Sequence, residues 1–257
     1  MRWLILAAAV LCGQTGLAQG RFSQAWAPVC TLGSEAAQGC DDIRARDILD
    51  ASSPPWQAVG RVNFANRDQR SHCTGVLVSQ NHVLTAAHCL YNAARKRWID
   101  PSGIRFVAGY QRGEKVAVSQ VQTYHLHAEQ NVSGRFDNRA ALDWAVLELA
   151  DPIGQKTGFL PLAKTEVTSG FVVGYPGLRP HVLSGTPLCQ ARRYTDHLFG
   201  AICPVMMGDS GAPLLVNTDD GLRVAGILSR IAATPEGIDA LFLSVTAFQK
   251  ALDNQVP

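Results

Sequence analysis

Twelve short segments of strand type follow one another between residues 56 and 245, and no helical segment alternates with them. They are rich in β-branched and aromatic residues, and glycine, proline, asparagine or serine separates them. The segments are 56–64, 74–78, 82–85, 104–110, 115–121, 143–149, 170–175, 181–189, 201–204, 212–216, 223–229 and 240–245. Strands at this spacing favour a sandwich or a barrel over an alternating α/β fold. We therefore expect an all-β chain in two halves.

Four regions are predicted along the chain: 1–18, 19–55, 56–155 and 156–257. The first combines Arg2, a short apolar run and a small-residue cleavage pattern, which indicates a signal peptide. The second has little periodicity and ends in Ser-Ser-Pro-Pro, which indicates an extended leader or pro-region. The last two are the N-terminal and C-terminal β units. Residues 246–254 alone predict a terminal helix, with Thr246 as its N-cap.

The cysteines point to an oxidising compartment. Apart from Cys12 in the predicted signal peptide, they fall into three local couples, Cys30 with Cys40, Cys73 with Cys89, and Cys189 with Cys203. Such couples are typical of disulfides in secreted proteins, although six cysteines allow other pairings. No Cys-x-x-Cys cluster is present, so a structural zinc site is excluded. We expect a secreted or periplasmic protein.

Charge and hydropathy exclude two classes of partner. Lys plus Arg number 23 against 21 Asp plus Glu, and no dense basic block occurs, which argues against nucleic acid. No segment after the predicted signal peptide reaches the roughly 18 apolar residues that span a bilayer, so no membrane anchor is expected. His125-x-His127 has metal-binding alternation but no carboxylate pattern nearby, which favours a solvated strand face. We expect a monomer with no metal and no cofactor.

Three segments carry residues suited to catalysis, and they contain His88, Asp143 and Ser210. Taken singly, each has a structural explanation: His88 as a core histidine, Asp143 as a turn residue, and the segment around Ser210 as a tight turn. Together they suit acyl transfer, because a serine hydroxyl is a poor nucleophile until an imidazole takes its proton. A carboxylate holds that imidazole in the correct tautomer, and backbone amides stabilise the oxyanion. Gly208 and Ser210 are placed to donate those amides.

The same segments resemble the chymotrypsin/trypsin-like serine peptidases, in particular their compact secreted bacterial branch. The resemblance covers residues 56–252. It rests on Thr-Ala-Ala-His-Cys at 85–89, Asp-Trp-Ala-Val-Leu-Glu-Leu at 143–149 and Gly-Asp-Ser-Gly-Ala-Pro at 208–213. It implies two six-stranded antiparallel β-barrels with the active site between them, and a protein or peptide substrate. It also implies a disulfide from Cys73 to Cys89.

Other readings of the serine motif fit less well. An α/β-hydrolase needs Gly-x-Ser-x-Gly and the order Ser, Asp, His, whereas here Ala212 replaces the last glycine and both partners precede Ser210. A Gly-Asp-Ser lipase motif would lie near the N-terminus and continue with leucine. A catalytically silent, protease-like binding module is the alternative function. The intact His, Asp and Ser set argues against it.

The resemblance also predicts where substrate binds. The predicted substrate-binding residues are Pro204, Val205, Leu228, Ser229, Arg230 and Ile231. Pro204 stands where trypsin-like members carry an acidic residue, and Leu228 stands where glutamyl endopeptidases carry a histidine. The sequence thus predicts small or medium apolar side chains at the cleavage site. These residues also fit a barrel core, and Arg230 fits either a rim charge or a contact to an acidic group.

Asp209, beside the predicted nucleophile, suggests a means of activation. It resembles the family aspartate that pairs with an N-terminal ammonium after a pro-peptide is removed. Ile43 lies 13 residues before Trp56, the family spacing for such a new N-terminus. Cleavage between Asp42 and Arg46 is therefore a hypothesis, and a purely local hydrogen bond of Asp209 is the alternative.

Overall fold

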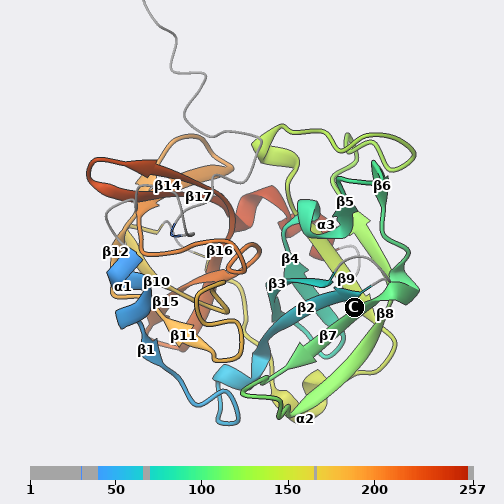
Figure 1. Ribbon diagram of the computed structural model, residues 1–257, viewed down its shortest axis with the longest axis horizontal. Coiled ribbons are helices and arrows are strands. Elements are labelled where there is room, and N and C mark those ends of the chain that lie inside the picture. Colours follow the sequence, from blue (N-terminus) through green and yellow to red (C-terminus); the bar gives the residue numbers. More distant parts are fainter. Residues whose placement is uncertain (1–29, 31–39, 66–69, 165–166, 254–257) are drawn as a thin grey trace, which may run out of the picture.

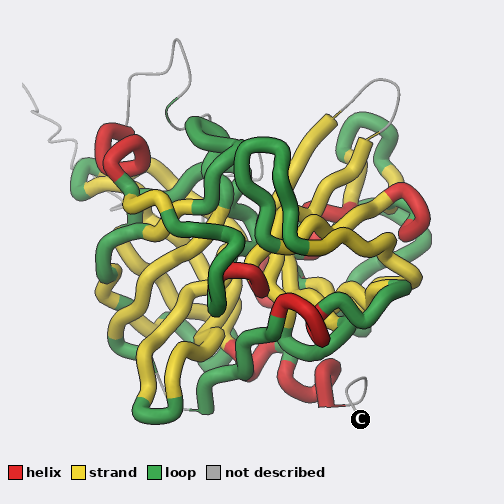
Figure 2. The backbone as a smooth tube through the Cα atoms, turned by 90° about the horizontal axis from the view of Figure 1, so that it is seen from below, coloured by secondary structure: helices red, strands yellow, loops and turns green. Residues whose placement is uncertain are grey.

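The computed structural model describes residues 30, 40–65, 70–164 and 167–253. Figure 1 shows two β units beside each other, one coloured cyan to green and the other mainly yellow to red. Figure 2, seen from below, shows the strands in two groups with only short helices around them. The predicted all-β class is confirmed. The predicted signal peptide and most of the predicted leader lie outside the described residues.

The first unit is a closed six-stranded barrel in which every neighbouring pair is antiparallel. In barrel order its strands are β2 (Val59–Ala65), β3 (Arg70–Leu77), β4 (His82–Thr85), β9 (Ala145–Leu149), β8 (Ala117–Leu126) and β7 (Ile104–Ala108). Val62, Val76, Leu84, Phe106 and Leu147 are fully buried in one apolar cluster. Closure leaves this unit without a sheet edge of its own.

The second unit is a nine-stranded antiparallel sheet, with more strands than the six expected. Its strands are β1 (Asp47–Ile48), β11 (Ser184–Gly185), β10 (Ser169–Gly174), β15 (Pro213–Thr218), β16 (Gly221–Thr234), β17 (Gly237–Ser244), β14 (Leu198–Ile202) and β13 (Arg192–Arg193), with β12 (Cys189–Gln190) paired to β10. Four of the nine have two residues each. The predicted strand 181–189 divides into β11 and β12 around Pro187, which has no amide for a ladder.

Short elements complete the fold. A two-stranded ribbon joins β5 (Tyr91–Asn92) to β6 (Arg97–Trp98). The 3-10 helices are η1 (Trp56–Ala58), η2 (Ala87–Leu90), η3 (Pro101–Gly103), η4 (Ala140–Leu142) and η5 (Val245–Ala247), and the α-helices are α1 (Cys40–Ala45), α2 (Gly154–Thr157) and α3 (Gln249–Asp253). The terminal helix is thus found, but Ser244 caps η5 by accepting from the Thr246 amide. Thr246 itself is not the cap.

The end of the predicted leader is folded against the second unit. Residues 40–45 form α1, and β1 pairs with β11, Asp47 opposite Gly185 and Ile48 opposite Ser184. Ile43 has no exposed surface and belongs to an apolar cluster of the second unit. The expectation of an extended segment is therefore wrong for residues 40–45, which are helical. Burial of the apolar Ile43 side chain stabilises the folded form of this segment.

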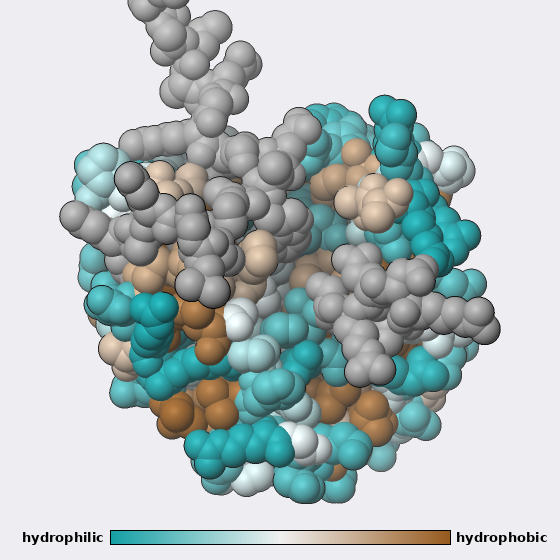
Figure 3. Space-filling view, in the orientation of Figure 1, coloured by the Kyte–Doolittle hydropathy of each residue, from teal (hydrophilic) through white to brown (hydrophobic). Residues whose placement is uncertain are grey.

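All three expected disulfides are present, Cys30–Cys40, Cys73–Cys89 and Cys189–Cys203. Figure 3 shows hydrophilic residues over much of the described surface on this face, with separate apolar patches among them. Among the described residues, none of the helices has the length and apolar character needed to cross a membrane.

Candidate active site

Strand register brings His88 and Asp143 to the same end of the barrel. β4 and β9 pair antiparallel with Thr85 opposite Ala145. His88 follows β4 within η2, and Asp143 ends η4 just before β9. The end of β4 and the start of β9 lie side by side. The imidazole of His88 and the carboxylate of Asp143 are therefore brought close together.

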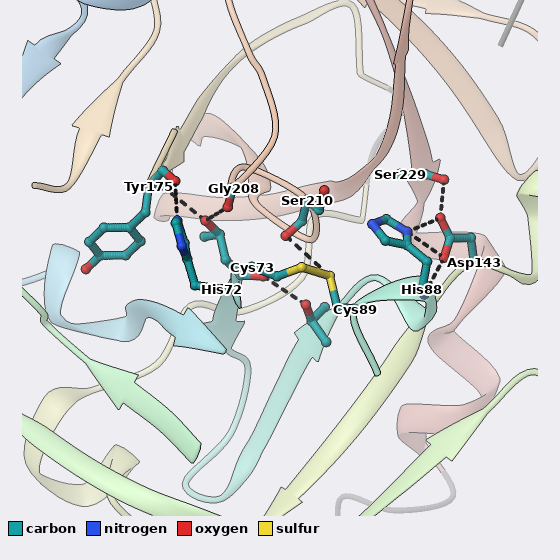
Figure 4. The surroundings of a disulfide bond; sticks show 11 residues. His72, Cys73, His88, Cys89, Asp143, Tyr175, Gly208, Ser210 and Ser229 are labelled. Carbon is teal, nitrogen blue, oxygen red and sulfur yellow. Dashed lines mark hydrogen bonds and ion pairs between the residues drawn. A yellow bond between two sulfur atoms is a disulfide. The ribbon is translucent and has the colours of Figure 1, made fainter. Parts of the chain in front are cut away.

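The carboxylate of Asp143 fixes the imidazole in position. Nδ1 of His88 lies 2.8 Å from Oδ2 and 3.0 Å from Oδ1, and the His88 amide donates to Oδ1 at 2.9 Å. Asp143 has no exposed surface. Because the carboxylate accepts from the Nδ1–H group, Nε2 is left to act as the proton acceptor. Figure 4 shows Ser210 on the side of the ring opposite Asp143.

A third group, Ser229, reaches the same carboxylate from the second unit. Its hydroxyl donates to Asp143 Oδ2 at 2.6 Å, and the residue is 3% exposed. In the ladder between β16 and β17, Leu228 faces Phe242 and Arg230 faces Leu241, so Ser229 is an extra residue in a bulge. A bulge redirects a side chain, and here the redirected hydroxyl contacts the first unit.

The loop around Ser210 depends on two glycines. Gly208 has φ +98°, and a Cβ there would lie 2.4 Å from the Tyr175 carbonyl oxygen. Gly211 has φ +76°, and a Cβ there would lie 2.3 Å from the Thr85 hydroxyl. Other residues rarely adopt such φ values, and neither position has room for a side chain. The loop conformation therefore requires glycine on both sides of Ser210.

Thr74, on β3 of the barrel, fastens this loop to the first unit. Its amide donates to the Ser210 carbonyl at 2.9 Å, and its hydroxyl donates to the Gly208 carbonyl at 2.8 Å. The Tyr175 amide in turn donates to the Thr74 hydroxyl at 3.1 Å. Thr74 was not among the residues predicted from the sequence, although its place directly after Cys73 of the Cys73–Cys89 disulfide was a usable signal.

Two amides of the loop are available to a ligand. Within the described part of the chain, the amides of Gly208 and Ser210 donate no hydrogen bond, whereas the Asp209 amide donates to Met206 at 3.0 Å. The Gly211 amide donates to the Leu228 carbonyl at 2.7 Å. The two unused donors flank the bonded one, an arrangement suited to stabilising an oxyanion.

Asp209 is paired with a side chain from the end of the predicted leader. Its Oδ2 lies 2.7 Å from Nη1 of Arg46, and both side chains have no exposed surface. Burial raises the pKa of the Asp209 carboxyl, and the Arg46 guanidinium and the Met206 amide oppose that rise. Arg46 was not predicted from the sequence, and it occupies the place that the cleavage hypothesis gave to a freed N-terminus.

His72, directly before Cys73, lies close to the loop. Its Nε2 is 3.0 Å from the Tyr175 carbonyl oxygen. Burial, with a smaller contribution from Arg61, lowers the pKa of His72 to about 4. The ring is therefore neutral around pH 7 and donates to that carbonyl.

Three of the predicted substrate-binding residues, Val205, Leu228 and Ser229, are buried. Val205 and Leu228 are 0% and 1% exposed and belong to the apolar cluster that contains Ile43. Ile231 is half-buried against that cluster and faces Ala240 on β17. Pro204 is half-buried. The cluster thus brings Val205, Leu228 and Ile231 together, whereas Ser229 turns toward Asp143.

Arg230 is held by a neighbouring loop. Its guanidinium donates to the carbonyl oxygen of Asn138, in the segment before η4. This contact joins the bulged strand β16 to the loop that leads to Asp143.

The described residues contain one group of three close metal-ligating side chains, Cys73, His88 and Cys89. Two of the three are joined in a disulfide, so the group does not suit a metal ion. His125 and His127 have separate surroundings. His125 lies 3.8 Å from a Glu148 carboxylate oxygen, and His127 packs edge-on against Trp144.

Comparison with known proteins identifies the family. The trypsin family model matches residues 47–252, which include every element of the site described above except Arg46. The chain belongs to the trypsin family. This trypsin-family chain is 30% identical over 206 residues to the serine protease SP24D of Anopheles gambiae, covering 70% of this chain and 72% of that protein. The relationship makes it a serine endopeptidase.

Other relatives are longer proteins. Transmembrane protease serine 5 of Homo sapiens is 24% identical over 82% of this chain, which spans 53% of that protein. Tissue-type plasminogen activator of Rattus norvegicus is 24% identical over 78% of this chain, which spans 42% of it. A solved structure of a Glu endopeptidase superposes with a TM-score of 0.65 at 19% identity, covering 80% of this chain and 95% of that one. This likeness shows the same fold.

Proposed function

We propose that the chain hydrolyses peptide bonds through His88, Asp143 and Ser210. Ser210 Oγ attacks the carbonyl carbon while its proton passes to His88 Nε2. His88 then gives that proton to the departing amine, which leaves an acyl group on Ser210. A water molecule, activated by the same ring, attacks the acyl carbon and releases the acid. The observation that carries the proposal is the buried Asp143 carboxylate, which holds the His88 ring from one side.

The amides of Gly208 and Ser210 are the proposed oxyanion donors. Losing one donor of this kind typically raises the barrier by about 3–4 kcal/mol. Thr74 supports this role because it fixes the two carbonyl groups next to those amides. The loop is then ordered before the substrate binds.

The proposed substrate is an extended peptide that pairs with residues 229–231. β16 pairs with β15 only as far as Ile227. Beyond that point residues 230–234 of β16 pair only with β17 among the described strands, which leaves their other edge without a strand partner there. An extended peptide adds to such an edge through its main chain. A preference for small or medium apolar side chains is supported by Pro204 and Leu228, which stand where relatives bind charged side chains. Because a methylene changes selectivity by about 1–3 kcal/mol, we expect broad specificity.

A fluorophosphonate probe tests the proposal. The wild-type chain is expected to be labelled, and the Ser210→Ala variant is expected to remain unlabelled. Absence of labelling in a folded wild-type protein would favour the silent binding module. Cleavage of a diverse peptide library, read by mass spectrometry, then tests the apolar preference.

We further propose that the protein acts as a secreted monomer. The three disulfides are consistent with an extracellular location. Sedimentation of the purified protein tests the monomeric state, and a concentration-dependent shift in mass would contradict it.

A further inference from the structure

The cation beside Asp209 comes from the uncut chain. Arg46 lies between α1 and β1, and its guanidinium uses both terminal nitrogens. Nη1 donates to Asp209 Oδ2 at 2.7 Å, and Nη2 donates to the Ser184 carbonyl at 2.6 Å. Neither side chain of the ion pair is exposed. A buried carboxylate without a counter-charge is strongly destabilising, so the partner of Asp209 matters.

The segment that carries Arg46 is firmly attached. The Arg46 carbonyl accepts from Arg179 Nη1 at 2.6 Å, and the Leu49 amide donates to the Leu183 carbonyl at 3.0 Å. Between them, β1 pairs with β11. On the other side, Ile43 is buried in the core of the second unit. These contacts hold Arg46 in place without any new chain end.

The ion pair acts on the loop that contains the proposed oxyanion donors. Asp209 Oδ2 also accepts the Met206 amide at 3.1 Å, and the Asp209 carbonyl accepts the Ala212 amide at 2.7 Å. The carboxylate thus holds the start of the turn that exposes the amides of Gly208 and Ser210, and the Asp209 main chain holds its end. Gly174 lies beneath it, where a Cβ would be 2.5 Å from Asp209 Oδ1, so the carboxylate has little room to move.

We propose that Arg46 is a positioning residue that orders the oxyanion loop through Asp209 in the uncut chain, so that cleavage between Asp42 and Arg46 is not required for activity. The inference rests on the proposed function. It makes residues 40–50 part of the active enzyme and not of a discarded leader. A new ammonium at Ile43 would have to displace a guanidinium that already has two acceptors.

The first test identifies the N-terminus of the active species. The secreted protein is labelled with a fluorophosphonate, and the labelled chain is analysed by intact mass and N-terminal sequencing. The labelled chain is expected to begin before Cys40. A labelled population that begins only at Ile43 or later overturns the proposal. An unlabelled wild-type protein would instead count against the proposed function.

The second test removes the guanidinium. Arg46→Ala is expected to lower kcat for a peptide ester by about 100-fold, the size of a lost oxyanion donor, with little change in KM. Affinity for a peptide boronate should fall with kcat, because the boronate occupies the oxyanion site, whereas a product peptide should bind as before. Arg44→Ala is the matched control, since Arg44 lies on the same segment and pairs with Asp41 at the surface. It should retain the activity of the wild type.

Rescue distinguishes positioning from general stability. Ethylguanidinium should restore part of the activity of Arg46→Ala, and sodium chloride at the same ionic strength should not. Arg46→Lys keeps the charge and loses one acceptor, so it should have intermediate kcat. If Arg46→Ala does not fold, Arg46→Gln and Arg46→Lys are compared by the same measurements. The role of Arg46 would be overturned if the folded variants kept the kcat and the boronate affinity of the wild type. The proposed function would still stand in that case, provided that the probe labels the wild-type protein.

Discussion

In the first unit the site residues stand at the ends of paired strands in a closed barrel, whereas in the second unit Ser210 stands in a loop between strands. The first unit places His88 and Asp143 by the register of β4 and β9. The second unit places Ser210 by special φ values at Gly208 and Gly211 and by a buried ion pair from a distant segment. The comparison teaches that a strand ladder positions groups through local pairing, whereas a loop needs contacts from elsewhere.

The largest effect is expected from the variants that test whether residues of the two units act together in catalysis. Ser210→Ala and His88→Ala should each lower kcat by about 10⁶-fold, because the two side chains act on the same proton. The double variant should lose no more than either single variant. Steady-state rates on a peptide ester measure this. Additive losses would mean that the two units contribute independently.

A smaller effect is expected from the carboxylate. Asp143→Asn keeps the shape of the side chain but favours the wrong tautomer of His88, and kcat should fall by about 10⁴-fold. Unfolding by denaturant should show whether the barrel stays intact. A loss of only a few-fold would mean that strand register alone orients the ring.

The contact between the units is tested at Ser229. Its hydroxyl is one of several groups on Asp143, so Ser229→Ala should lower kcat about tenfold, the value of one hydrogen bond to a charged group. Ser244→Ala is a suitable control because Ser244 also lies in the second unit and caps η5. Equal kcat in the Ser229→Ala variant and the wild type would show that the bulge in β16 serves the fold only.

The last effect concerns stability in acid and not the rate of catalysis. The pKa of His72 is lowered to about 4 in the folded protein, whereas an unfolded histidine titrates near 6.5. Between these values the unfolded chain binds the extra proton, so the unfolding free energy falls as the pH falls from 6.5 toward 4. Protonation of His72 is expected to lower the free energy of unfolding by about 1–3 kcal/mol over this range. This loss is absent above pH 6.5.

His72→Gln should remove that part of the slope, as measured by denaturant unfolding at several pH values. The pKa of His82 is also lowered by burial, so a residual slope remains in both proteins. Parallel curves for the variant and the wild type would show that His72 contributes nothing to acid sensitivity.

Much of the fold could be predicted from local pattern. The strand-type runs locate the long strands of both units, and the sequence-local cysteine couples match the three disulfides. The His88, Asp143 and Ser210 motifs each lie in a short segment, so their residue types could be found without any knowledge of contacts.

The missed features depend on contacts between distant segments. Arg46 is 163 positions from Asp209, and a charged residue in a segment with little periodicity is expected to be exposed. The two-residue strands of the second unit have no pattern of their own, because pairing with neighbouring strands alone defines them. The bulge at Ser229 is likewise a property of the ladder and not of β16 by itself.

The long separation between Arg46 and Asp209 sets an order of events during protein synthesis. The residue that neutralises the loop is made early, and the loop itself follows 163 positions later. A nascent polypeptide on the ribosome therefore holds the cation long before it holds the anion. On this scheme the hydrolytic centre cannot assemble until the polypeptide has been translated beyond Asp209.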